Sequence, residues 1–191
     1  MRPIALAALV FVTLPQTPAL SQPQLPPQSA VDVTSANIRA TLKEAPPEGV
    51  MDQQIRVIDI GKYNVAVGVL HRAAKAKQTA IDHAQVTEVY HIIDGSGTLV
   101  LGPDIADMKR RPATEETVRL FNGPGNNGST IRDGKTYQLK TGDVVIIPAG
   151  TGHWFTKIDD HIDYLMVRID PDKVTPVKDE TESQAYLKTT R

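Results

Sequence analysis

The sequence contains no cysteine, few aromatic residues and no strong excess of charge of either sign. The absence of cysteine excludes disulfide bonds, thiolate metal ligands and cysteine nucleophiles, so any metal must be bound by histidine and carboxylate side chains. The formal net charge of -1 lacks the basic excess of nucleic-acid-binding proteins, and no nucleic-acid partner is expected. A chain of 191 residues is long enough for one domain with a hydrophobic core.

Long hydrophobic runs are also missing, apart from a short one near the N-terminus. Residues 3–14, PIALAALVFVTL, follow a positively charged Arg2 and are too few for a comfortable membrane span. Ala19 and Ser21 supply the small residues that a signal-peptidase site needs. We therefore expect a cleaved signal peptide over residues 1–21 and an exported protein, periplasmic or extracellular, with no membrane partner after cleavage. A buried helix or an uncleaved anchor is the alternative.

Proline and glycine are plentiful, at 14 and 13 residues, which indicates many turns and favours β structure. Ser35 can cap one short helix in TSANIRATLKEAPP, which Pro46 and Pro47 would end. The expected organisation is a disordered Pro/Gln-rich lead-in over residues 22–34, a single domain over 35–172 with its core in 54–170, a polar loop insertion over 103–130, and a polar tail over 173–191.

Beyond the helix the apolar residues alternate as they do in strands. The stretches QIRVIDIG and YNVAVGVLHR predict two strands, and EVYHIIDGSGTLVLG predicts a hairpin that turns at residues 94–97. TYQLKTGDVVIIPAG, HWFTKI and DYLMVRIDP predict more strands. Many short strands separated by turn signals are typical of a β-sandwich or a small barrel.

The stretch 88–93, EVYHII, has apolar residues on both of its faces. Glu88, Tyr90 and Ile92 share one face, and the alternate residues share the other. A small barrel with one core should be polar outside, so the second apolar face predicts a covering layer. Either the N-terminal segment or a second subunit could supply it, and we expect a homodimer.

Two motifs resemble those of the cupin superfamily. His83, Glu88 and Gly95 have the spacing of the end of its first motif, and GDVVIIPAGTGH, from Gly142 to His153, fits its second motif in spacing and in its glycines. The resemblance covers about residues 54–170. The first histidine of the family falls at Ile81, however, and the closing asparagine of the second motif is Lys157.

This resemblance implies an all-β fold, a small double-stranded β-helix or jelly-roll (cupin) barrel with a short N-terminal helix. It also implies a divalent metal ion (Fe, Mn, Zn, Ni or Cu) held at the barrel mouth by His83, Glu88 and His153. Two histidines and one carboxylate are a known set for non-haem iron, and three protein ligands also suit catalytic zinc. His83 and Glu88, five residues apart, can converge only if the chain bends between them.

A metal-free barrel is the alternative, because one ligand position is lost. A buried Glu88 without a metal would need another cation, such as Arg72 or Arg168.

The pocket candidates are Tyr90, Phe155, Tyr164, Met166 and His71, although such aromatic and methionine residues are more often plain core. His91 should point away from the interior, and His161 lies in a charged loop. The function expected is that of an exported cupin barrel that binds a metal and a small polar molecule, with isomerase, lyase or dioxygenase activity open. The alternative is a metal-free binding protein without catalysis.

Overall fold

The structure, a computed structural model, describes residues 29–189. The predicted signal peptide and most of the predicted lead-in lie outside the described residues. Residues 29–34 enter the fold without helix or strand, and Val33 packs against a hydrophobic cluster beneath the first helix. Within the part of the chain that the structure describes, no helix is long and apolar enough to cross a membrane.

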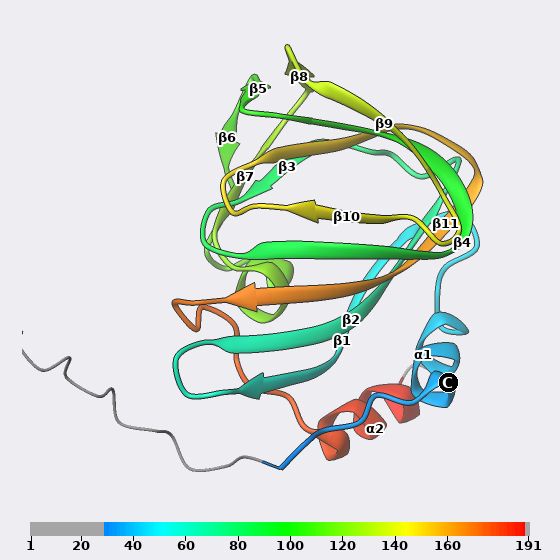
Figure 1. Ribbon diagram of the computed structural model, residues 1–191, viewed down its shortest axis with the longest axis vertical. Coiled ribbons are helices and arrows are strands. Elements are labelled where there is room, and N and C mark those ends of the chain that lie inside the picture. The colour runs from blue at the N-terminus through cyan, green and yellow to red at the C-terminus, as the bar shows by residue number, and fades with distance from the viewer. Residues whose placement is uncertain (1–28, 190–191) are drawn as a thin grey trace, which may run out of the picture.

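The described chain is mainly antiparallel β structure with a helix at each end (Figure 1). In chain order the elements are α1 (Ser35–Leu42), β1 (Val50–Asp59), β2 (Asn64–Ala73), β3 (Ala80–His83), β4 (Thr87–Gly102), β5 (Asp104–Ala106), β6 (Lys109–Arg110), the π-helix η1 (Val118–Asn122), β7 (Gly125–Gly128), β8 (Thr130–Arg132), β9 (Lys135–Lys140), β10 (Val144–Ile147), β11 (Gly152–Asp170) and α2 (Glu180–Thr189).

The two longest strands, β4 and β11, pair with each other along their length and hold the barrel together. The second half of β11 also pairs with β2, which pairs with β1, while the first half of β4 pairs with β10. The second half of β4 pairs with β9, and β11 contacts β3, which continues to β7 and β6. The strands wrap around a common interior (Figure 1), so the predicted double-stranded β-helix barrel is confirmed.

The prediction of a hairpin turn at residues 94–97 is wrong, because β4 runs through these residues as one bent strand. The bend lies where the pairing with β11 shifts register between Ile158 and Ile162. Gly95 has φ of 75° here, and a Cβ on it would lie 2.0 Å from the carbonyl oxygen of His161. Glycine at a sharp bend within a strand and glycine in a hairpin turn give the same sequence signal.

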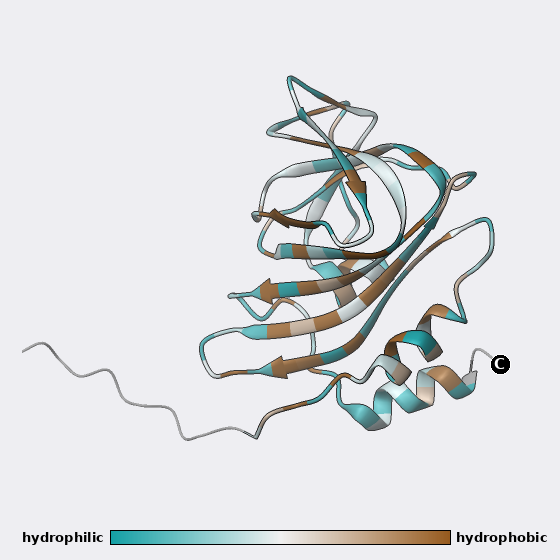
Figure 2. Ribbon diagram, turned by 45° about the vertical axis from the view of Figure 1, so that its right-hand side comes forward, coloured by the Kyte–Doolittle hydropathy of each residue, from teal (hydrophilic) through white to brown (hydrophobic). Residues whose placement is uncertain are grey.

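Hydrophobic and hydrophilic residues alternate along the strands (Figure 2). The side chains that point inward from β4 and β11 form the main core, together with residues of β2, β9 and β10. Outside the barrel, α1 covers β1 and β2 through Ile38 and Leu42, which pack on Met51, Ile55 and Val69. The N-terminal segment therefore covers this part of the outer surface and not β10, where Val144 and Ile146 are exposed.

Two features at the N-terminal helix and the C-terminal segment differ from expectation. The N-cap of α1 is Thr34, whose side chain accepts a hydrogen bond from the Asn37 backbone, and Ser35 is the first helical residue. The predicted polar tail contains α2, which packs beside β1. Asp179 and Glu182 cap this helix reciprocally, which is the sequence signature that could have predicted it.

The predicted loop insertion over residues 103–130 is more ordered than expected. β5 pairs with β8, while β6 and β7 extend the barrel sheet. The π-helix η1 lies between β6 and β7 in the chain and ends at buried Asn122. This segment closes one side of the interior cavity described below.

Candidate metal centre and the adjoining cavity

His83, Glu88 and His153 come together at one end of the barrel interior. His83 ends β3, Glu88 stands near the start of β4, and the chain turns between them at residues 84–86, as their convergence requires. His153 is the second residue of β11 and pairs with Ile81 across to β3. All three side chains are buried, and one ligand atom from each lies within 4.8 Å of the others. The sequence prediction thus named residues that are neighbours in space.

The Glu88 carboxylate is surrounded by hydrogen-bond donors. Its Oε1 accepts a hydrogen bond from Arg168 Nε at 2.7 Å, and its Oε2 accepts one from the Tyr90 hydroxyl at 2.5 Å. Burial would raise the pKa of this carboxyl, but the neighbouring His83, Arg168 and His153 hold it well below its ordinary value. Glu88 is therefore ionised at neutral pH.

Arg168 links Glu88 to a second acidic residue. Its two terminal nitrogens donate to the two oxygens of Asp52 on β1, at 3.0 and 2.6 Å. This bidentate pairing fixes the plane of a guanidinium whose side chain is only 2% exposed. One buried cation thus serves two carboxylates, which leaves one negative charge of the three groups uncompensated.

The orientation of His153 shows which ring nitrogen faces Glu88. Its Nδ1 lies 3.2 Å from the carbonyl oxygen of Thr151, and because a carbonyl only accepts, we assign the proton to Nδ1. Burial lowers the pKa of His153 to about 4, so the ring is neutral and Nε2 carries a lone pair. That lone pair faces Glu88 Oε2 at 3.7 Å, and neither atom can donate a hydrogen bond to the other.

A divalent ion fits between these atoms. Two ligand atoms about 2.1 Å from one ion at a near-tetrahedral angle lie about 3.4 Å apart. His83 Nε2 is 3.4 Å from Glu88 Oε1, and His153 Nε2 is 3.7 Å from Glu88 Oε2. The contact of His153 with Thr151 is the outer hydrogen bond that ligating histidines usually make. His83 lacks this support, since its buried Nδ1 has no hydrogen-bond partner among residues 29–189.

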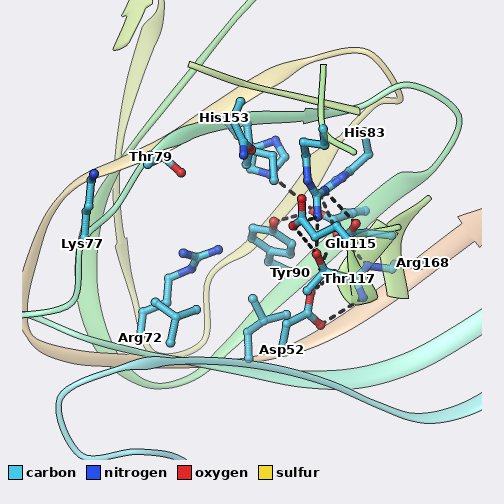
Figure 3. Close-up of a pocket in the computed structure, with 17 residues that line it drawn as sticks. Asp52, Arg72, Lys77, Thr79, His83, Tyr90, Glu115, Thr117, His153 and Arg168 are labelled. Atoms are coloured by element: carbon cyan, nitrogen blue, oxygen red, sulfur yellow. Dashed lines mark hydrogen bonds and ion pairs between the residues drawn. The ribbon is translucent and has the colours of Figure 1, made fainter. Parts of the chain in front are cut away.

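The three residues line a cavity of about 250 Å³ (Figure 3). Ile81, which occupies the position of the missing histidine, lines it as well. Of the pocket candidates, Tyr90 lines this cavity, whereas Phe155, Tyr164 and Met166 do not and belong to the hydrophobic core. For those three the core interpretation is the one that holds; strand alternation places a side chain inside the barrel without telling core from cavity.

The remaining histidines lie away from the cavity. His71, a predicted pocket residue, does not line it, and its Nδ1 is 2.6 Å from an Asp163 oxygen. His91 is exposed on β4, as expected. His161 contacts Asp160 and Asp94 at the surface. None of these three joins the metal group found among the described residues.

Several charged and polar residues of the cavity were not predicted as site residues. Arg168 had been weighed as a cation for Glu88 and has that role, which its strand phase with Tyr164 and Met166 supports. The others come from distant parts of the chain and give no local signal: Asp52, Lys77, Arg111, Glu115, Thr117 and Asn122.

Comparison with known proteins gives one family match and many remote structural matches. Residues 128–190 match the AraC-like ligand binding domain. No curated protein matches the chain.

Three solved structures illustrate the remote similarity. A protein from Bacillus halodurans is 11% identical, with a TM-score of 0.44, over 81% of this chain and 93% of that chain. The EutQ protein of Clostridium difficile is 15% identical, with a TM-score of 0.39, over 64% and 69% of the two chains. An RmlC-like cupin family protein from Methanocaldococcus jannaschii is 14% identical, with a TM-score of 0.39, over 65% and 85%. Similarity at this level does not extend to function.

The fold, the motifs and the family match agree with one another. The barrel is held by two long bent strands, and the motif residues His83, Glu88 and His153 meet at its end. The matched family is a cupin-type ligand-binding domain, and its match includes all of β11. The fold and the match over residues 128–190 support the resemblance to the cupin superfamily.

Proposed function

We propose that this protein binds a divalent metal ion through His83, Glu88 and His153 and takes a small polar molecule into the adjoining cavity. One observation supports the metal above all: the unprotonated Nε2 of His153 faces an ionised carboxylate in a buried site. Two buried acceptors that face each other are unfavourable unless a cation or a donor such as water lies between them. A divalent ion would accept lone pairs from all three residues at once.

The residues of this chain would divide the work at such a site. Bound there, a divalent ion would polarise an oxygen of the small molecule, which suits isomerase, lyase or dioxygenase chemistry. Arg168 and the Tyr90 hydroxyl hold the Glu88 carboxylate in a fixed orientation. Thr151 holds the His153 ring, and Ile81 adds an apolar surface beside it. A cavity of about 250 Å³ suits a small molecule rather than a polymer.

A metal-free binding protein is the second candidate, and one contact favours it. Arg168 already donates a 2.7 Å hydrogen bond to Glu88, so the carboxylate has a permanent cationic partner. In this case the histidines would donate hydrogen bonds directly to the bound molecule or accept them from it, and no chemical step would follow.

Metal content of the purified protein decides between the two. We expect about one Fe, Mn, Ni, Cu or Zn per chain by mass spectrometry, and loss of this metal in His153→Ala and Glu88→Gln. The matched control is His91→Ala, which removes an exposed histidine from the same strand as Glu88. Each variant is checked for folding by circular dichroism. A wild-type chain that stays metal-free after reconstitution with each of the five metals would contradict the proposal.

We also propose that the protein is exported, on the strength of the N-terminal hydrophobic segment followed by Ala19 and Ser21. Cell fractionation together with the mass of the mature chain tests this. A chain that keeps Met1 in the cytoplasm would contradict it.

A homodimer is proposed from the outer surface of β10 and β4. Val144 and Ile146 are 59% and 63% exposed, and β10 pairs on one side only, with β4, among the described strands. Light scattering at micromolar concentration should give twice the chain mass, and Ile146→Lys should shift it to a monomer. A monomeric wild-type mass would contradict the proposal.

A further inference from the structure

Two cations on the cavity wall have no acidic partner among the described residues. Figure 3 shows Arg72, Lys77 and Thr79 on the side of the cavity away from His83 and Glu115. Within residues 29–189, neither Arg72 nor Lys77 makes an ion pair, and the side-chain hydrogen bonds of Arg72 go to neutral groups. Both charges are therefore available to a bound molecule.

The acidic residues of the cavity, in contrast, are already paired. Asp52 and Glu88 share Arg168, and Glu115 pairs with Arg111 at 2.8 Å. The lining holds four Arg and Lys side chains and three Asp and Glu side chains, so the protein itself contributes one excess positive charge. A single bound carboxylate would offset this excess.

Arg72 is held so that part of its guanidinium remains free. Its Nε donates to the Tyr164 hydroxyl at 2.9 Å, and one terminal nitrogen donates to the Gln78 side chain at 2.8 Å. A guanidinium has about five N–H donors, so these two bonds leave three. The group also stacks over the Phe155 ring, with 5.4 Å from its central carbon to the ring centroid. A fixed, half-buried guanidinium loses little entropy when it binds a carboxylate.

The protein surface that adjoins this wall is cationic as well. A surface groove shares Lys77, Thr79 and Arg111 with the cavity, and it adds Lys109 and Arg110 against one acidic residue, Asp107. The buried Nε of Arg111 has no hydrogen-bond partner among the described residues. Such a groove favours the entry of anions over neutral molecules.

We propose that the molecule bound in this cavity is a small carboxylic acid, anchored by Arg72 and Lys77 with its other end toward His83, Glu88 and His153. This deepens the proposed function by naming the class of molecule, and it rests on that function for the role of the metal. Arg72 fixes the carboxylate plane, and exposed Lys77 supplies the second charge at the side of the groove.

Thermal shifts with matched acids and amides test this proposal. The probes are carboxylic acids of two to six carbons at millimolar concentration, each beside its primary amide, with inorganic phosphate as a separate probe. We expect at least one acid, but not its amide, to raise the melting temperature of the wild type by a few degrees. Arg72→Gln should weaken the binding of that acid by about 10-fold or more, and Lys77→Gln by a smaller factor.

Three controls keep the result interpretable. Lys75→Gln removes a nearby exposed lysine that pairs with Glu48 outside the cavity, and it should bind the acid as the wild type does. Arg72→Lys keeps the charge in case Arg72→Gln folds poorly, and it should bind with intermediate strength. Lys77→Gln changes an exposed side chain and should fold normally.

Several results would overturn the anchor. These are equal shifts with acid and amide, no shift with any acid, a shift with phosphate alone, or unchanged acid binding in both Arg72→Gln and Lys77→Gln. Metal analysis of the same samples separates this proposal from the proposed metal centre. Acid binding that needs Arg72, in a chain that stays metal-free after reconstitution with each of the five metals, would refute the metal and keep the anchor. A metal-loaded chain whose acid binding is unchanged in Arg72→Gln would support the metal centre and refute the anchor.

Discussion

The two ends of the barrel interior differ sharply in chemistry although the same strands build both. At one end Ile92, Leu99 and Ile162 are fully buried in the hydrophobic core. At the other end Glu88 and Arg168 are equally buried but charged. The first end stabilises the fold by removing apolar surface from water, whereas the second must compensate the cost of burying charge by pairing.

The change from one end to the other takes place within single strands. Along β4 the inward residues are Glu88, Tyr90 and Ile92, and along β11 Tyr164 is followed in the same phase by Arg168. Tyr90 stands at the boundary, because its ring packs 4.3 Å from the Tyr164 ring while its hydroxyl donates to Glu88. Two residues further along a strand are thus enough to turn a core into a binding site.

The largest effect is expected from breaking the charged end, by Arg168→Met. Methionine fills similar space but leaves Glu88 and Asp52 buried without their shared cation. We expect the free energy of unfolding to fall by about 3–5 kcal/mol, measured by urea denaturation. Added metal should restore part of this loss if the ion binds Glu88.

The matched control is Arg132→Met, which removes a bidentate pair with Asp104 from the exposed surface. Because solvent screens this exposed pair, its loss should lower the free energy of unfolding far less than Arg168→Met does. Equal losses in the two variants would show that burial does not set the value of the Arg168 pairs.

A second prediction uses pH to sharpen the comparison between a buried and a half-buried histidine. Burial lowers the pKa of His153 to about 4, whereas unfolding returns it to about 6.5. Between these values the unfolded chain binds a proton that the folded chain does not, so stability falls as pH drops through this window. A pKa that falls from 6.5 to about 4 on folding corresponds to a loss of about 3 kcal/mol of unfolding free energy, measured on metal-free protein by urea denaturation between pH 7 and pH 4.

The opposite sign is expected for His161. Hydrogen bonds from its ring to Asp160 and Asp94 raise its pKa although partial burial lowers it. Its contribution is therefore present below about pH 6.5 and is lost as pH rises through the folded pKa. NMR titration of the two rings should show His153 titrating below and His161 above the ordinary value. If both rings titrated near the same pH, the opposite pKa directions of His153 and His161 would be contradicted.

The sequence predicts the apolar end better than the charged end. Alternation within β4 and β11 follows from local chemistry, and the motif resemblance brings His83, Glu88 and His153 together. The pairing of Asp52 with Arg168 joins residues 116 positions apart, and no local pattern encodes it. Whether an inward side chain contacts solid core or cavity depends on such distant partners, which is why the sequence could not place Phe155, Tyr164 and Met166.

The smallest effect is expected at the apolar end, from Ile92→Val. Ile92 is completely buried, and the loss of one methylene group should cost about 0.5–1.5 kcal/mol of unfolding free energy. Metal content and acid binding should stay at the wild-type level, because Tyr90 separates Ile92 from the charged residues. If acid binding weakened as much as stability did, Tyr90 would be transmitting core packing to Glu88, and the two ends of the barrel would be one coupled unit.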